Sequence, residues 1–328
     1  MSFLACRVHR EEKSIHYQLE TMEEQQLSKS GVLIRIEYSG INYKDALGVT
    51  GKGSIYKQFP INAGIDCAGI VESSTDPRFK AGDAVLVNGC GLGENQDGGL
   101  AQKVRVPADW VIKMPDGLDS RSAMIIGTAG FTAALAIDRM EQNDQSPEQG
   151  SIVVTGASGG VGSFAISMLS HLGYNVIAVS GRAVHSDYLK QLGANKVVTA
   201  EQLELGSRPL EEARFAGVID SVGGDLLSGL LRHIDLWGNV VCIGMAADAN
   251  YQATVFPLIL RGVSLLGASS ANCPMPRRKR VWQRIGKDLL PDNIESIVSA
   301  EVNLADIGPC FNEILERRHR GRILINCQ

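Results

Sequence analysis

A glycine-rich turn between residues 151 and 162 constrains the fold of this chain more than any other segment. It follows the apolar, β-branched run 152–155 and precedes a segment, 163–172, in which apolar residues recur at helical spacing. A strand, a tight turn and a helix in this order bring free backbone N–H groups and the positive end of a helix dipole to one point. The segment therefore predicts a site for the pyrophosphate of a dinucleotide. The residues predicted to contact it are Ser158, Gly159, Gly160 and Val161.

The residues after the second predicted strand, at 176–180, indicate which dinucleotide is bound. This strand ends roughly 20 residues beyond the glycine turn, where NAD-binding sites carry Asp or Glu against the ribose. The chain instead has Ser180-Gly181-Arg182 and no carboxylate before Asp187. A guanidinium suits the 2′-phosphate of NADPH, because it offers several donors to an oxyanion. Unless Arg182 is only a solvated loop charge, the sequence predicts NADPH rather than NADH as the cofactor.

Composition and charge restrict the classes of partner. The chain has 328 residues, enough for two domains, and its 44% hydrophobic and 21% charged residues are typical of globular proteins. A net charge of −4 gives no indication of binding to nucleic acid or to a membrane surface. No apolar run approaches the roughly 20 residues needed to span a bilayer. We therefore expect neither a nucleic-acid partner nor a membrane association.

Cysteine usage and the first residues indicate the compartment. The seven cysteines are odd in number and include no C-x-x-C pair, a pattern typical of free thiols in a reducing compartment. The segment 1–13 is charged within seven residues and lacks the apolar stretch of a signal peptide. These features predict a cytoplasmic location.

The hydrophobic pattern divides the chain into two kinds of segment. Up to about residue 120, alternating or apolar runs separated by Gly and Pro predict strands at 32–38, 67–73, 84–88 and 100–106, as in a compact β-barrel or sandwich. From about residue 121, strands and helices alternate, which predicts a parallel, doubly wound sheet. The strands of that sheet are expected at 152–155, 176–180, 196–199, 216–220, 239–243 and 263–268, with helices that include 160–172 and 184–192.

The last 60 residues are expected to return to the first domain, with a helix near 276–290 and a closing strand at 322–326. The predicted domains are therefore a discontinuous β-rich one, 1–120 and 269–328, and an inserted nucleotide-binding one, 121–268. The active site is expected in the cleft between them, where open α/β sheets place their ligands.

The domain order and the run Ala157-Ser158-Gly159-Gly160-Val161-Gly162 resemble the medium-chain dehydrogenase/reductase superfamily. Further motifs are Asn42-Tyr43-Lys44-Asp45-Ala46-Leu47, Gly64-Ile65-Asp66-Cys67-Ala68-Gly69, Gly93-Glu94-Asn95, Gly98-Gly99-Leu100-Ala101, the run 124–133, Ser180-Gly181-Arg182, and Cys273-Pro274 followed by Arg277, Arg278 and Trp282. Together they resemble the zinc-independent YhdH/YhfP branch, which is described as quinone oxidoreductases and NADPH-dependent acrylyl-CoA reductases. The resemblance covers essentially the whole chain. It implies an α/β fold with a Rossmann sheet inserted into a GroES-like barrel that forms the catalytic domain.

The same comparison bears on zinc. Zinc-dependent relatives place a Cys ligand in the loop matching residues 42–45 and have Gly-His-Glu where this chain has Gly64-Ile65-Asp66. A catalytic zinc needs about three protein ligands, and Ile65 replaces one of them. The resemblance therefore implies no metal, and without a Lewis acid the expected chemistry is conjugate reduction of an already activated C=C bond or quinone.

Asn42, Tyr43 and Asp66 are the predicted catalytic residues. The Asn42 amide can donate to an enolate oxygen, and the Tyr43 hydroxyl can donate to the carbonyl, contact the cofactor or supply a proton. The alternatives are that Asn42 only holds a turn and that Tyr43 is a half-buried aromatic. Asp66 is expected either to orient Asn42 or a substrate group, or to bind backbone amides near Gly64. Lys44 and Asp45 are expected to form a local ion pair or a helix cap.

Further cofactor contacts are expected from Thr128, Ile243 and Gly244. Thr128 either touches the nicotinamide or starts a helix as its N-cap. Ile243 and Gly244 end the fifth strand of the doubly wound sheet, at the edge where ligands bind. The basic run 277–280 either binds the phosphates of coenzyme A or is a solvated helix face. Asp97 and the segment 267–271 depart from the branch pattern and are expected to border the substrate pocket.

These observations predict NADPH-dependent reduction of a small α,β-unsaturated acyl-CoA, acrylyl-CoA to propionyl-CoA, by hydride transfer without a metal. The alternatives are an NADPH-dependent quinone or reactive-enone oxidoreductase and, from another class, a non-catalytic NADPH-binding sensor. The apolar strand at 263–268 can pair with its copy across a two-fold axis, and the resemblance to the superfamily implies a homodimer of this kind.

Overall fold

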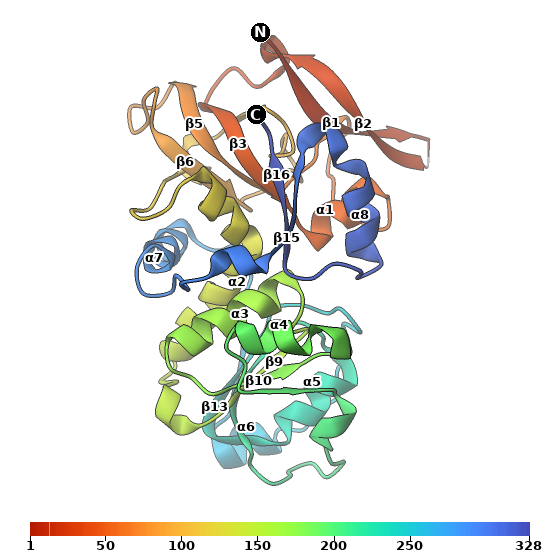
Figure 1. Ribbon diagram of the computed structural model, residues 1–328, viewed down its shortest axis with the longest axis vertical. Helices are drawn as coiled ribbons and strands as arrows, with labels where there is room; N and C mark the ends of the chain where they lie inside the picture. Colours follow the sequence, from red (N-terminus) through yellow and green to blue (C-terminus); the bar gives the residue numbers. More distant parts are fainter. Residues whose placement is uncertain (13) are drawn as a thin grey trace. The chain divides into compact units, whose positions relative to one another are not determined.

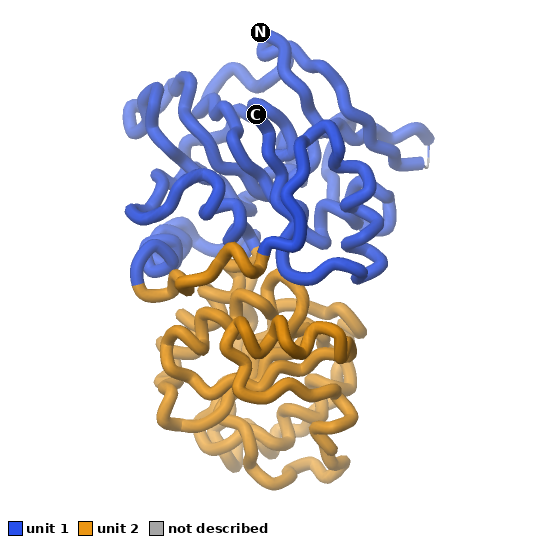
Figure 2. Tube along the Cα trace, in the orientation of Figure 1, with its two compact units in different colours: residues 1–128, 270–287, 298–328 blue, residues 129–269, 288–297 orange. Residues whose placement is uncertain are grey.

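The computed structural model describes residues 1–12 and 14–328, and the chain divides into two compact units (Figure 2). The first unit contains residues 1–128, 270–287 and 298–328, so it is built from three separate stretches of the chain. The second contains residues 129–269 and 288–297. The boundary between residues 128 and 129 falls inside a helix, α2, which spans Ser120–Glu141.

The first unit is β-rich, as the sequence predicts. A seven-stranded sheet has the order β15-β16-β3-β5-β6-β8, with β7 paired to β3, and a smaller sheet has the order β2-β1-β4. The strands of the larger sheet are β3 (Val32–Ile41), β5 (Asp66–Ser74), β6 (Ala84–Asn88), β7 (Lys103–Val106), β8 (Ile112–Lys113), β15 (Val298–Asn303) and β16 (Arg322–Asn326). Those of the smaller sheet are β1 (Ser2–Glu11), β2 (Ser14–Glu23) and β4 (Ile61–Asn62).

Strand β3 shows why this sheet forms. Val32, Ile34 and Ile36 on one face are buried, and on the other face Leu33 is buried while Arg35 is exposed, so one face is covered and the other is covered in part. Its antiparallel partner on one side is β16, in a register that places Ile323 opposite Ile41. One hydrophobic core therefore joins the beginning and the end of the chain.

Three helices besides the first part of α2 belong to the first unit: α1 (Tyr43–Val49), α7 (Met275–Ile285) and α8 (Gly308–Leu315). Helices α1 and α8 lie side by side (Figure 1). Helix α7 is amphipathic and buries Val281, Trp282 and Ile285, which recur at the spacing of one helix face. It confirms the helix predicted near 276–290, although it ends five residues earlier.

The second unit confirms the predicted Rossmann sheet. Its six strands are all parallel and follow the order β11-β10-β9-β12-β13-β14. The strands are β9 (Ile152–Thr155), β10 (Val176–Val179), β11 (Lys196–Val198), β12 (Phe215–Asp220), β13 (Ile234–Cys242) and β14 (Ser264–Gly267). The helices are α3 (Gly160–His171), α4 (Ser186–Gln191), α5 (Gly224–Leu231) and α6 (Phe256–Arg261), together with the second part of α2. The strand order reverses between β9 and β12, which is where ligands bind in such sheets.

Helix α2 corrects the expectation that no apolar segment approaches the length of a membrane span. Its 22 residues are long and apolar enough to cross a membrane by length and composition alone. Thr128 and two glycines, Gly127 and Gly130, interrupt the apolar run without making it polar. However, 83% of the apolar window is buried inside the protein, and Gly127, at φ 47° and ψ −156°, breaks the helix. A buried core helix meets the same criterion, so the finding is weak evidence for a membrane span.

Candidate functional site

Three predicted site residues of the first unit, Asp66, Asn42 and Thr128, are joined by hydrogen bonds to the Asp66 carboxylate. Asp66 is the first residue of β5 and is completely buried. Its Oδ2 accepts hydrogen bonds from Asn42 Nδ2 at 2.8 Å and from the backbone N–H of Thr128 at 2.8 Å. Its Oδ1 accepts from the Thr128 hydroxyl at 2.6 Å. Such bonds to an ionised acceptor are short and strong, so Asp66 fixes both Asn42 and Thr128.

The kink at Gly127 explains how Thr128 reaches this carboxylate. A positive φ at residue 127 interrupts the helical ladder of α2, and glycine adopts this conformation at little cost. A Cβ atom at this position would lie 2.7 Å from Asp66 Oδ2. The backbone N–H of Thr128 is therefore directed at Asp66.

Arg322, which sequence reasoning missed, completes the cluster. It is the first residue of β16 and only 3% exposed. Its Nη1 donates to Asn42 Oδ1 at 2.8 Å, and its Nη2 is paired with Asp66 Oδ2 at 3.5 Å. Burial lowers the pKa of Arg322, and the charges of Asp66 and Asp45 oppose this shift. The available signal in the sequence was a single charge at the start of an otherwise apolar closing strand.

The neighbours of Asn42 determine which way its amide points. A guanidinium can only donate and a carboxylate can only accept, so Oδ1 faces Arg322 and Nδ2 faces Asp66. The amide oxygen is therefore occupied, and one Nδ2 hydrogen is bound to Asp66. The other has only a long approach, 3.5 Å, to the carbonyl oxygen of Gly40. Asn42 can thus offer a further ligand an N–H donor rather than an acceptor.

Asp45 holds the backbone of the same loop. Its Oδ2 accepts from the N–H of Asn42 at 2.8 Å, and its Oδ1 accepts from the N–H of Ile65 at 3.1 Å. The predicted cap at the start of α1 is therefore confirmed, and Asp45 rather than Asp66 binds the backbone near Gly64. Burial raises the pKa of Asp45 to about 7, and the nearby charge of Asp66 acts in the same direction.

Tyr43 lies apart from these contacts. It is the first residue of α1 and 48% exposed, and it has no hydrogen-bond partner among residues 1–12 and 14–328. The next residue, Lys44, forms an ion pair with Glu94 at 2.7 Å, so of the two expected alternatives for Lys44 and Asp45 the cap is the one present. The Tyr43 hydroxyl is consequently available to a ligand.

In the second unit, the predicted pyrophosphate residues lie at the start of α3. Gly156 follows β9 with φ +60°, and its carbonyl accepts from the N–H of Gly159 at 3.0 Å. A Cβ atom on Gly162 would lie 2.5 Å from the Gly156 oxygen, so only glycine lets α3 pack this closely. The half-buried residues Ser158, Gly159, Gly160 and Val161 surround the helix N-terminus, where the first N–H groups lack helical partners.

The end of β10 presents the residues expected to contact the ribose. Ser180 is buried, and its hydroxyl accepts from the N–H of Arg182 at 3.3 Å. A Cβ atom on Gly181 would meet nothing within 4 Å, so this position is open. Within the described part of the chain, Arg182 forms no ion pair with a carboxylate. Its guanidinium is therefore available to an anionic ligand.

Asp220, a buried aspartate, was not among the predicted site residues. It forms hydrogen bonds at the point where the strand order reverses. Asp220 ends β12, and its Oδ1 accepts from the hydroxyl of Thr155, the last residue of β9, at 2.6 Å. Its Oδ2 accepts from the N–H of Gly223 at 2.8 Å. Burial raises the pKa of Asp220. The backbone of Ile243 bonds to the carbonyl of Asp220, which places Ile243 and Gly244 at the same edge of the sheet.

In the basic run of helix α7, Arg278 departs from the expected surface position, whereas Lys279 and Arg280 are exposed. Arg278 is completely buried and donates to the carbonyl oxygens of Asn88 at 2.5 Å, Ser270 at 2.7 Å and Ala271 at 3.0 Å. It therefore fixes the loop before α7 and is neither a phosphate ligand nor part of a solvated face. The Asp97 carboxylate accepts from the backbone N–H of Asn62 at 2.9 Å.

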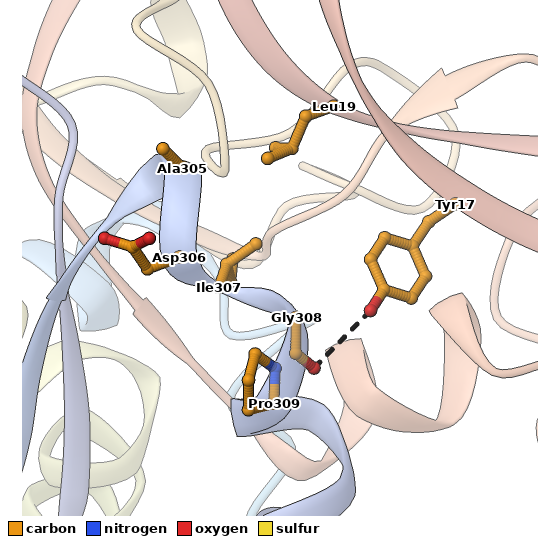
Figure 3. Close-up of a pocket in the computed structure, with 7 residues that line it drawn as sticks. All are labelled: Tyr17, Leu19, Ala305, Asp306, Ile307, Gly308 and Pro309. Atoms are coloured by element: carbon orange, nitrogen blue, oxygen red, sulfur yellow. Dashed lines mark hydrogen bonds between the residues drawn. The ribbon is translucent and has the colours of Figure 1, made fainter.

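A hollow in the first unit lies away from the predicted residues. It is lined by Tyr17, Leu19 and the segment 305–309, and Figure 3 shows the Tyr17 hydroxyl directed at the carbonyl oxygen of Gly308, 3.4 Å away. None of the predicted site residues lines it, so the chemistry expected from the sequence is not placed there.

Two family models match the chain. Residues 28–116 match the alcohol dehydrogenase GroES-like domain, and residues 160–286 match the zinc-binding dehydrogenase family. The residues at the expected zinc position do not fit that metal: Ile65 is buried and apolar, and the Asp66 carboxylate already accepts from Asn42, Thr128 and Arg322. Among residues 1–12 and 14–328, no group of three His, Cys, Asp or Glu side chains is arranged to hold a metal ion.

Curated relatives match nearly the whole chain. "Putative quinone oxidoreductase YhfP" of Bacillus subtilis is 44% identical over 98% of this chain and 98% of its own length. "Probable acrylyl-CoA reductase AcuI" of Escherichia coli is 45% identical over 94% of both chains.

Solved structures of related proteins also match nearly the whole chain. The YhdH oxidoreductase of Salmonella enterica in complex with NADP is 43% identical with a TM-score of 0.95, covering 99% of this chain and 100% of that one. Bacillus subtilis YhfP with NAD bound is 44% identical with a TM-score of 0.96, covering 99% of both chains. The chain therefore belongs to the medium-chain dehydrogenase/reductase superfamily, in the branch that contains YhdH and YhfP.

Proposed function

We propose that this protein is an NADPH-dependent oxidoreductase that reduces the C=C bond of a small α,β-unsaturated acyl-CoA, converting acrylyl-CoA to propionyl-CoA. The observation that carries the proposal is the fixed Asn42 amide, whose oxygen is occupied and whose remaining N–H is a donor. The 45% identity to AcuI, which is named as a probable acrylyl-CoA reductase, supports the choice of substrate.

When bound, NADPH supplies a hydride to the β-carbon of the thioester. Negative charge then develops on the thioester carbonyl oxygen, where a pre-oriented donor is most effective. Asn42 Nδ2 is the donor assigned to this oxygen. The α-carbon must gain a proton, and the exposed Tyr43 hydroxyl or a water molecule delivers it. Asp66 contacts no substrate in this scheme, because its oxygens are occupied by protein donors, and it acts by orienting Asn42.

The competing function is reduction of a quinone or reactive enone, which the name of YhfP favours at 44% identity. The two are separated by following NADPH absorbance with acrylyl-CoA, crotonyl-CoA and a simple quinone in parallel. We expect rapid turnover of acrylyl-CoA and slow reduction of the quinone. Comparable or faster quinone reduction with inert CoA esters would overturn the proposal in favour of the competing one.

NADPH is assigned to the second unit through Ser158 to Val161, Ser180 to Arg182 and the end of β13. We expect Arg182→Ala to raise KM for NADPH by about tenfold and to leave KM for NADH unchanged, because a charge-assisted bond is worth about 1.5–3 kcal/mol. Steady-state kinetics with both cofactors measures this. Lys190→Ala, which removes an exposed cation on α4, is the matched control. An equal rise for NADPH and NADH would contradict the assignment of the 2′-phosphate to Arg182.

A homodimer formed through β14 is also proposed. This strand lies at the edge of the six-stranded sheet, where a second copy can extend the pairing. Next to the sheet, α6 and β13 present exposed apolar side chains, among them Trp237 and Ile259, each 72% exposed. Trp237 also has φ 59°, which is unusual for a bulky residue. An apolar patch of this kind marks an interaction surface.

Ile259→Asp is expected to convert the dimer to a monomer, because it buries an unpaired charge in the interface. Sedimentation velocity measures the change. Val184→Asp places the same charge on another exposed apolar residue of the second unit, 82% exposed, and should leave the dimer intact. A wild-type chain that sediments as a monomer at all concentrations would refute the dimer.

All seven cysteines are free, which supports the proposed cytoplasmic location.

A further inference from the structure

The Arg322 guanidinium uses all of its hydrogen-bonding capacity inside the protein. It has five N–H donors. Nε donates to the carbonyl of Ile125, Nη1 to Asn42 Oδ1 and to the carbonyl of Ile41, and Nη2 to Asp66 and to the carbonyl of Met124. No donor remains for a substrate, so Arg322 can affect a reaction only through its neighbours.

Two glycines leave room for this side chain. A Cβ atom on Gly40 would lie 2.4 Å from Arg322 Nη2, and one on Gly127 would lie 2.5 Å from the same atom. Any larger residue at either position would displace the guanidinium. The two positions come from β3 and α2, far apart in sequence, yet both accommodate the same charged group.

A buried charge is costly unless it is fully paired. Arg322 is 3% exposed and Asp66 is completely buried, and a hydrophobic pair of similar volume would often be as stable. What an apolar replacement could not provide is the orientation of Asn42. Between the two charges, the amide has only one arrangement in which Oδ1 accepts and Nδ2 donates.

We propose that Arg322 is a positioning residue for the reduction: it holds the Asn42 amide so that the second N–H of Nδ2, whose contact with the Gly40 carbonyl is 3.5 Å long, faces the substrate carbonyl. This inference rests on the proposed function. The guanidinium holds the amide in one orientation. The oriented N–H then stabilises the negative charge that develops on the substrate oxygen in the transition state. Arg322 therefore acts on kcat rather than on NADPH binding.

The test is a double-mutant cycle with Arg322→Lys, Asn42→Ala and the double variant, measuring kcat for acrylyl-CoA and for the quinone. Arg322→Lys keeps the charge but loses the planar fork. We expect it to lower kcat by about 10- to 100-fold, as for a misplaced catalytic group, and to leave KM for NADPH unchanged. In the Asn42→Ala background the same change should lower kcat by less than about twofold, because residues that act as a unit are not additive.

Arg278→Lys is the matched control, since Arg278 is also completely buried in the first unit but binds the carbonyls of the loop before α7. It should lower the midpoint of thermal unfolding without changing kcat of the folded protein. If Arg322→Lys does not fold, Arg322→Gln, which removes the buried charge and keeps a donor for Asn42, replaces it in the cycle with Asn42→Ala.

The outcomes separate the inference from the function on which it rests. An equal fall of kcat on Arg322→Lys in both backgrounds would show that Arg322 acts independently of Asn42, and the inference would fail while the function stands. If Asn42→Ala leaves kcat unchanged with every acceptor, both the role of Asn42 in the proposed function and the inference are overturned.

Discussion

Replacing Asn42 by alanine is expected to lower kcat for acrylyl-CoA by about 100- to 1000-fold, the usual cost of removing one donor from a developing oxyanion. The variant loses the Nδ2 donor assigned to the substrate oxygen, while the glycine turn of the second unit is untouched. KM for NADPH should therefore stay within about twofold of the wild-type value. Single-turnover measurement of NADPH oxidation isolates the chemical step from product release.

Asn326→Ala is the control for this variant. Asn326 lies on β16, near Arg322 in sequence, but its carboxamide oxygen accepts from the backbone N–H of Gln328 at 2.9 Å and is no part of the Asp66 cluster. Its loss should leave kcat unchanged. Tyr43→Phe distinguishes the two proton sources: a fall in kcat assigns the proton to Tyr43, and an unchanged kcat assigns it to water. An Asn42→Ala variant with wild-type kcat would remove the amide from the mechanism.

Gly162→Val should abolish tight NADPH binding. The added Cβ would lie 2.5 Å from the Gly156 oxygen and 2.7 Å from the Ala157 Cα. Both are backbone atoms that cannot rotate away, so α3 must move away from β9. The N–H groups at the start of α3 then no longer point to the same phosphate position. Overpacking of this kind costs about 1–3 kcal/mol of stability, and a displacement of about 1 Å at a binding site can cost about 100-fold. Fluorescence titration with NADPH and thermal unfolding measure the two effects.

Gly267→Ala provides the comparison, because a Cβ there would meet nothing within 4 Å and its φ is not in the left-handed region. It should bind NADPH with the wild-type Kd. Wild-type affinity in Gly162→Val as well would mean that the close approach of α3 to β9 is not needed for the cofactor.

The second sheet is predictable from sequence because its central strands, β9 and β12, are short, fully buried runs that need no alternation. Strand β13 is the exception in extent, since it begins at Ile234, five residues before the prediction. Its first part contains Asp235 and the exposed Leu236 and Trp237, which carry no pattern of burial. Neither β1 nor β2 is among the predicted strands. Strand β1 does bury Phe3, Ala5, Cys6 and Val8, but β2 gives no such signal. In β2 only Met22 is buried, so nothing in its composition distinguishes a strand from a polar loop.

The candidate site is less predictable than the fold. The motif around residue 42 identifies Asn42, and the strand start identifies Asp66, but their mutual contact depends on three-dimensional proximity. Arg322 lies 280 residues after Asn42, and no local pattern connects them. Arg278 shows the converse: a run of four basic residues suggests a solvated surface, yet tertiary packing buries the one side chain that can satisfy three carbonyls of a loop.

The pairing of β3 with β16 has a consequence for how the protein is made. A ribosome releases residues 32–41 early, but their antiparallel partner, residues 322–326, emerges almost at the end of synthesis. The six strands of the second sheet lie between residues 152 and 267, so they are complete while β3 still has an open edge. A nascent chain that stops before Arg322 thus contains every strand of the nucleotide-binding sheet but leaves the Asn42 amide without one of its two anchors. On the proposed function, we expect such a truncated chain to keep the strands of the NADPH-binding sheet and to lose NADPH oxidation.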